Sequence, residues 1–174
     1  MKTLIQSMAD VDVRVFLKIY GLNGRRYLDH LMTALSVLGN GYLYPVLLAL
    51  CAVVDWQTAQ VLLPVFGLAI VVELAVTQSL KRAFRRERPC EILRGIAFSV
   101  SPQDRFSFPS GHTASAFLTA TLISFYPLLT VPAFLYASLM GFSRVYNGVH
   151  YASDVIAGMI LGTASALTGL WILA

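Results

Sequence analysis

Long apolar stretches with very few charges alternate with short charged segments along this chain. Residues 31–80 and residues 106–174 each contain only two charged side chains. Because a helix needs about 20 apolar residues to cross a bilayer, each stretch is long enough for two or three spans. The pattern predicts five membrane-spanning helices, at about residues 31–54, 61–80, 110–126, 128–142 and 152–173, with a Gly39-Asn40-Gly41 interruption in the first.

The first twenty residues show a different, amphipathic pattern. Five apolar residues recur at steps of three or four, which puts them on one face of a helix. They are Leu4, Met8, Val11, Val15 and Ile19. Such a helix can lie on the membrane surface, or it can be an ordinary first helix that packs on the bundle. We expect no cleavable signal peptide, because residues 1–10 lack a seven-residue apolar core.

These elements together predict an all-α fold. The expected architecture is a polytopic transmembrane helix bundle of about five spans plus an N-terminal amphipathic surface helix. Its length favours a single membrane-embedded domain over residues 1–174.

The composition supports a membrane protein and excludes several other classes. Apolar residues make up 57% of the chain and charged residues only 13%, whereas a soluble domain carries roughly 25% charge. Disordered, collagen-like and coiled-coil chains are therefore excluded. Two cysteines are too few for a disulfide scaffold. We do not expect Cys51, in a span, to bridge to Cys90, in a charged loop.

The five-span prediction also sorts the charges by side. All 13 Lys and Arg fall at one membrane face, and Trp56 and Trp171 fall at the other, where aromatic belts form. The positive-inside rule then assigns the charged face to the cytoplasm of a multi-pass inner-membrane protein. Residues 81–94 hold six Lys and Arg against two Glu. This cluster suits anionic lipid, and no nucleic-acid partner is expected between membrane spans.

The first motif that can carry chemistry is K-R-A-F-R-R-E-R-P at residues 81–89. Lys81 and Arg88 are seven residues apart, so on a helix they share a face, with Arg85 between them. Pro89 is expected to end that helix. Such a row of cations can bind a phosphate, or it can simply anchor lipid headgroups at the end of a span.

The second motif is S-F-P-S-G-H-T at residues 107–113. It precedes an apolar run, so it predicts a helix start, whose free N–H groups can bind an anion. Gly111 permits close approach of a ligand to the backbone, and His112 lies in the first turn. The alternative is a helix cap at Ser110 with a neighbouring interfacial histidine.

The third motif is S-R-V-Y-N-G-V-H-Y-A-S-D at residues 143–154. Ionisable residues in such an apolar stretch suggest function, and here they are Arg144, His150 and Asp154. Asp154 lies four residues after His150, so its carboxylate can fix the tautomer of the ring and leave the other nitrogen nucleophilic. Alternatively, the pair only satisfies two buried polar groups. The Asn-Gly turn at residue 147 directs His150 back toward the site.

The span prediction brings the three motifs to one membrane face. Together they supply cations, N–H donors, two histidines and one carboxylate, with no thiolate and few acids to hold a metal. This set suits phosphoryl transfer through a phosphohistidine. Two alternatives remain: a redox protein with His112 and His150 as axial haem ligands, and a non-enzymatic protein that binds anionic lipid through the basic cluster.

The three motifs resemble those of the type 2 phosphatidic acid phosphatase superfamily, which also includes vanadium haloperoxidases. The family pattern is K-x6-R-P, then P-S-G-H, then S-R-x5-H-x3-D. This sequence matches it in order and spacing with Lys81, Arg88-Pro89, Pro109-Ser110-Gly111-His112, Ser143-Arg144, His150 and Asp154.

The resemblance implies a role for each matching residue. His150 would be the nucleophile, Asp154 would orient it, and His112 would be the general acid. The phosphate would be held by Lys81, Arg88, Ser110, the Gly111 N–H and Arg144. The implied enzyme is a metal-independent phosphatase without a cofactor. Its substrate would be a membrane lipid phosphate such as phosphatidylglycerol phosphate, phosphatidic acid or undecaprenyl diphosphate. Many relatives have six spans, and bacterial relatives often have the active site outside the cytoplasm.

Three further features allow two interpretations each. Glu73 in the second span can relay protons or be paired within the bundle. The motif Gly158-x3-Gly162 can pack against a neighbouring helix within the chain or in a homodimer. The loop with Asp104, Arg105, Phe106 and Phe108 can be a lid over the site or an ordinary interfacial loop.

Overall fold

The computed structural model describes residues 4–41 and 43–174, with side chains from Ala9 onward. The side chains of Leu4 and Met8, two members of the predicted apolar stripe, lie outside the described set. The described residues form eight helices and no strand, so the all-α prediction is confirmed. The helices are α1 (Leu4–Tyr20), α2 (Arg26–Leu38), α3 (Leu43–Val54), α4 (Trp56–Phe84), α5 (Pro89–Ile92), α6 (Gly111–Ile123), α7 (Pro127–Tyr146) and α8 (Ala152–Leu173).

Three of these helices, α4, α7 and α8, are long and apolar enough to cross a membrane by themselves. The first predicted span is two helices, α2 and α3, which meet at an angle of 70° and would count as a fourth span. The predicted span at 110–126 is only the 13-residue α6. At 1.5 Å per residue, α6 is about 20 Å long, less than the roughly 30 Å hydrocarbon core.

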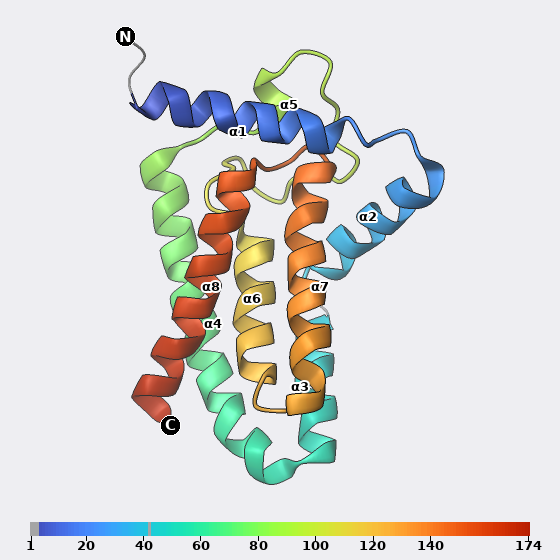
Figure 1. Ribbon diagram of the computed structural model, residues 1–174. Coiled ribbons are helices and arrows are strands. Elements are labelled where there is room, and N and C mark those ends of the chain that lie inside the picture. Colours follow the sequence, from blue (N-terminus) through green and yellow to red (C-terminus); the bar gives the residue numbers. More distant parts are fainter. Residues whose placement is uncertain (1–3, 42) are drawn as a thin grey trace.

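The short helix α6 lies at the centre of the bundle, flanked by α4, α7 and α8 (Figure 1). Leu118 and Leu122 on α6 are fully buried. A helix enclosed in this way has no lipid-facing surface to match to the bilayer thickness. Its sequence looks like a span because burial in protein and burial in lipid require the same apolar residues.

The glycine motif of α8 serves this central packing. A methyl group on Gly158 would meet the Ser110 carbonyl oxygen at 2.5 Å, and one on Gly162 would overlap the Ala114 carbonyl oxygen. Both glycines therefore let α8 approach α6 within the same chain. This outcome matches the interpretation that the motif packs within the chain. Helix α6 covers both glycines, so they are not exposed for a dimer contact.

Helix α1 lies across one end of the bundle, over α7 and α8 (Figure 1). Its packed face includes Asp12 and the fully buried Phe16, which contacts Tyr151. The predicted apolar stripe is not this packed face, because Val11 remains 49% exposed and Val15 is also exposed. Helix α1 therefore packs on the bundle, as one interpretation expects, and still presents Val11 and Val15 outward.

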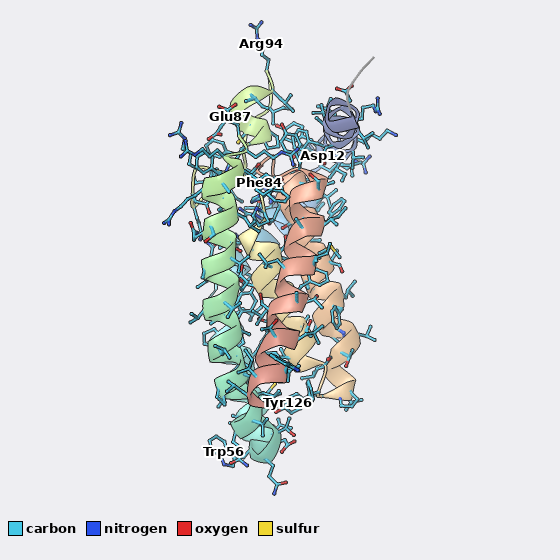
Figure 2. The ribbon with its side chains drawn as sticks, turned by 90° about the vertical axis from the view of Figure 1, so that its left-hand side faces the viewer. Asp12, Trp56, Phe84, Glu87, Arg94 and Tyr126 are labelled. Atoms are coloured by element: carbon cyan, nitrogen blue, oxygen red, sulfur yellow. The ribbon has the colours of Figure 1, made fainter. Side chains whose placement is uncertain are left out.

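The two ends of the molecule differ in chemistry, as the charge pattern predicts. Asp12, Glu87 and Arg94 lie at the end capped by α1, whereas Trp56 and Tyr126 lie at the opposite end (Figure 2). Both cysteines, Cys51 and Cys90, are free thiols. The predicted absence of a bridge is therefore confirmed.

Candidate active site

All three motifs contribute to the wall of one cavity of about 360 Å³. The motif residues that line it are Lys81, Arg88, Gly111, His112, Arg144 and His150. The remaining two matched site residues, Ser110 and Asp154, lie behind the wall, fully buried. The cavity continues along α4 past the apolar side chains of Leu74, Ile70 and Phe66. It therefore has a cationic end and an apolar end.

The first motif does not form the continuous helix that its spacing predicts. Helix α4 ends at Phe84, and Arg85 adopts a left-handed conformation with φ 47°. The side chain of Arg85 is exposed and donates to the Arg82 carbonyl, so it does not join the cavity. The prediction of a shared helical face is wrong here. Arg88 is instead extended, with φ −81° and ψ 153°, as expected for a residue before proline, and so returns to the cavity.

Lys81 and Arg88 converge on one carboxylate from the following loop. Asp104 Oδ1 lies 3.0 Å from Lys81 Nζ and 2.6 Å from Arg88 Nη2. Both cations also donate to the Phe106 carbonyl oxygen, at 3.0 and 3.1 Å. Burial raises the pKa of the Asp104 carboxyl, but the two cations outweigh burial and hold that pKa below its ordinary value. The loop is therefore attached to the cationic end of the cavity.

The second motif begins α6, as predicted. Ser110 is the N-cap, but its hydroxyl lies 2.9 Å from Thr113 Oγ1 and does not face the cavity. Gly111 and His112 do face it. His112 Nε2 lies 2.8 Å from Asn40 Oδ1. Because an amide oxygen only accepts, this contact assigns the ring proton to Nε2. Asn40 in the Gly-Asn-Gly interruption is therefore a site residue, whereas the sequence pattern indicated only an interruption of a span in this segment.

The third motif reaches the cavity from the end of α7. Arg144 is 1% exposed and donates to the Ser36 hydroxyl, while its Nε has no hydrogen-bond partner among the described residues. The chain then turns at Gly148, where φ is 82°, and the Arg144 carbonyl accepts the backbone N–H of His150 at 3.3 Å. The predicted Asn-Gly turn is confirmed, and it directs His150 back toward the cavity.

The His150 ring lies between a cation and a carboxylate. Its Nε2 is 3.1 Å from Arg88 Nη1, and its Nδ1 is 3.5 Å from Asp154 Oδ2. Burial, followed by the charges of Arg88 and the other nearby cations, holds the pKa of His150 well below its ordinary value. This shift favours the neutral ring, whose Nε2 can accept a hydrogen bond from Arg88 Nη1, and His150 lines the cavity.

Two residues that sequence reasoning missed stand behind Asp154. Arg86 donates to Asp154 Oδ1 at 2.7 Å, and Asp12 from α1 pairs with Arg86 at 2.6 Å. Arg86 belongs to the basic cluster, but on the predicted helix it did not share a face with Lys81 and Arg88, so no role was expected for it. Nothing in the sequence connects Asp12 to residues 74 and 142 positions further along the chain.

Glu73 lies on α4 below the cationic end and is fully buried. It accepts hydrogen bonds from Thr77 at 2.7 Å and from Ser115 at 3.1 Å. These contacts match the interpretation of an acid paired within the bundle.

Comparisons with known proteins agree with this arrangement. The family model described as the PAP2 superfamily matches residues 62–174. The crystal structure of LpxE from Aquifex aeolicus is 31% identical, with a TM-score of 0.81 over 92% of this chain and 95% of that one. The crystal structure of a PAP2-type phosphatidylglycerolphosphate phosphatase from Bacillus subtilis is 26% identical, with a TM-score of 0.73 over 95% and 86% of the chains.

Curated relatives match over shorter regions. Decaprenylphosphoryl-5-phosphoribose phosphatase from Mycobacterium tuberculosis is 38% identical over 56% of this chain and 54% of its own length. Lipid A 1-phosphatase from Porphyromonas gingivalis is 44% identical over 38% of this chain and 16% of its own. The matched regions thus span about half or less of these two relatives.

Proposed function

This chain belongs to the PAP2 superfamily, and from that premise we propose that it is a metal-independent membrane lipid phosphatase acting through a phosphohistidine. The observation that carries the proposal is the two-ended cavity. Lys81, Arg88 and Arg144 suit a phosphate at one end, and Phe66, Ile70 and Leu74 suit an apolar chain at the other. A soluble phosphate ester would leave the apolar end without a partner.

The geometry of His150 supports its role as nucleophile. Its Nε2 attacks phosphorus while the bond from phosphorus to the lipid oxygen breaks. Asp154, on the Nδ1 side, stabilises the positive charge that the ring gains. The side chains of Lys81, Arg88 and Arg144, together with the Gly111 N–H, neutralise the phosphate oxygens in the transition state.

His112 is the proposed proton donor. Once the ring is protonated on both nitrogens beside the bound phosphate, its Nε2–H, which contacts Asn40 in the free protein, passes to the leaving lipid oxygen and the ring becomes neutral. In the second step, His112 takes a proton from the water that hydrolyses the phosphohistidine. The products are the dephosphorylated lipid and inorganic phosphate.

The two alternative functions have weaker support. In the haem alternative, His112 and His150 would bind iron, but that role leaves Lys81, Arg88 and Arg144 in the cavity wall without a function. Cations around His150 also favour an anion over a metal ion. In the lipid-binding alternative, nothing requires the His150–Asp154 pair at the cavity wall.

The substrate is proposed as a lipid monophosphate or diphosphate at the membrane surface. The relatives carry names that refer to different lipids, so the test requires a panel. It includes phosphatidylglycerol phosphate, phosphatidic acid, undecaprenyl diphosphate, lipid A and a decaprenylphosphoryl phosphoribose. From the charge bias we propose that the site lies at the cytoplasmic face.

The test measures phosphate release from this panel by the purified protein in detergent. We expect activity that persists in chelator and is blocked by vanadate. His150→Ala should reduce the rate at least about 10³-fold, as loss of a nucleophile does. The matched control is His30→Ala, because His30 is exposed and outside the cavity wall. Full activity of His150→Ala would contradict the proposed mechanism.

A further inference from the structure

A charged network behind the cavity holds the carboxylate of Asp154 from the side opposite His150. Asp154 Oδ2 faces the His150 ring, whereas Asp154 Oδ1 accepts a hydrogen bond from Arg86 Nη1 at 2.7 Å. The Arg86 guanidinium carbon also lies 4.1 Å from the centre of the Tyr151 ring, a cation–π contact. Arg86 is not among the residues that line the cavity, and Asp154 is the proposed catalytic residue to which its side chain donates.

The network continues into α1. Arg86 Nη2 donates to Asp12 Oδ2 at 2.6 Å. Asp12 also accepts from the Ser153 backbone N–H at 3.0 Å and from the Ser153 hydroxyl. Asp12 is 7% exposed and Asp154 is fully buried. Two carboxylates, one from the helix that crosses the end of the bundle (Figures 1 and 2) and one from α8, thus share one guanidinium, on a side chain that is 28% exposed.

The physical consequence concerns the orientation of Asp154. A buried carboxylate that loses its cation either takes up a proton or turns toward another donor. Either change alters its contact with His150 Nδ1. Since a misplacement of about 1 Å in a catalytic group can cost about 100-fold in rate, the network is positioned to affect catalysis.

We propose that Arg86 and Asp12 are positioning residues for the reaction, which makes α1 part of the catalytic assembly. Arg86 and the Tyr151 backbone N–H together fix the rotation of the Asp154 carboxylate, and Asp12 with Ser153 fixes Arg86. Docking of α1 on the bundle therefore completes the site as well as covering its end. This inference rests on the proposed function, because it takes His150 as the nucleophile.

The test compares kcat and KM of Arg86→Met, Arg86→Lys and Asp12→Asn on the best lipid phosphate of the panel. We expect Arg86→Met to lower kcat about 10- to 100-fold with KM within about twofold, because the substrate does not touch Arg86. Arg86→Lys should recover part of the loss, and Asp12→Asn should show a smaller loss of kcat. The matched control is Arg82→Met, which removes an exposed arginine from the end of α4.

A double-variant cycle separates positioning from general stabilisation. If Arg86 acts through Asp154, adding Arg86→Met to Asp154→Asn should cost no further activity. Independent structural damage would instead make the two losses multiply. Inhibition by vanadate, measured on each variant with residual activity, checks that the cavity is intact. Should Arg86→Met fail to fold, Asp12→Asn and Arg86→Lys decide by the same measurements.

The outcomes also distinguish this inference from the proposed function. Unchanged kcat in Arg86→Met and Asp12→Asn, with His150→Ala inactive, would overturn the inference and leave the function standing. Multiplied losses in the cycle, or a rise in KM alone, would overturn it too. Full activity of His150→Ala would instead overturn the function on which it rests.

Discussion

At the scale of single residues, the cationic end of the cavity is occupied by an acid of the protein itself. Asp104 Oδ1 takes contacts from both Lys81 and Arg88 that a phosphate oxygen would need. An incoming phosphate must therefore displace Asp104 or lie beside it, and two anions in one place repel each other. Asp104 lowers the affinity of the free site for anions while it keeps two buried cations paired.

Removing the charge of Asp104 should therefore tighten anion binding. We expect Asp104→Asn to lower the vanadate concentration for half-inhibition about 10-fold, the factor that corresponds to about 1.4 kcal/mol. Inhibition curves in detergent measure this. Glu87→Gln is the control, because it removes an exposed negative charge at the same end of the molecule (Figure 2). Unchanged or weaker inhibition of Asp104→Asn would show that Asp104 does not compete with the anion.

The low pKa of His150 predicts how stability depends on pH. The native ring stays neutral below pH 6.5, whereas the ring in the unfolded chain takes up a proton there, near its ordinary pKa of 6.5. The unfolded state then binds more protons, so the free energy of unfolding falls as the pH drops below about 6.5. The melting temperature should fall between pH 7.5 and 5.5, and His150→Gln should show a smaller fall. An equal fall in wild type, His150→Gln and the exposed-site control His30→Gln would contradict this prediction.

At the scale of helices, the sequence predicted the elements better than their ends. Apolar runs located the spans, and the last one agrees with α8 (Ala152–Leu173). The same runs could not show that α6 is enclosed by protein, because an apolar sequence does not distinguish lipid from core. The left-handed end of α4 at Arg85 was also hidden, since arginine is a good helix former. Because α4 ends at Phe84, Arg86 lies outside the helix and can reach Asp154. A helix that continued to Pro89 did not predict this contact.

The contact between α6 and α8 is the helix packing most sensitive to added volume. A methyl group at Gly162 would overlap backbone atoms of α6, which cannot move as a side chain can. We expect Gly162→Ala to lower the free energy of unfolding by about 1–3 kcal/mol and to reduce activity, because α6 carries His112 and α8 carries Asp154.

The control for that substitution is Gly67→Ala on α4. A methyl group at Gly67 would meet nothing within 4 Å, and alanine favours helix more than glycine does. This variant should be as stable as the wild type or slightly more so. Thermal unfolding in detergent and phosphate release measure both variants. Equal stability of Gly162→Ala and Gly67→Ala would mean that α6 and α8 separate at little cost.

At the scale of the whole molecule, charge and aromatic residues are divided between its two ends. Arg94 lies at the end with the cavity and α1, and Trp56 lies at the other (Figure 2). The sequence predicted this division because the positions of Lys and Arg depend only on the order of spans. It could not predict that the segment between α2 and α3, which meet at 70°, would line the cavity through Gly39 and Asn40.

This division predicts the orientation in the membrane. With the charged end in the cytoplasm, a cysteine at Gln57 should react with a membrane-impermeant maleimide in intact cells. A cysteine at Arg94 should react only after the cells are permeabilised. Both positions are exposed and lie at opposite ends, so each controls for the other. The reverse labelling pattern would assign the site to the outer face.

Part of the cavity wall comes from the bent pair α2–α3, which lies outside the region that matches the family model. The region that matches the family begins at residue 62 and carries every motif residue, whereas Asn40, Tyr44 and Pro45 in the cavity wall come before it. This part of the chain nevertheless belongs to the site, because Asn40 contacts His112 and Ser36 accepts a hydrogen bond from Arg144. Exchanging the bent pair between related enzymes should therefore change the contacts of two site residues as well as the cavity wall that meets the lipid.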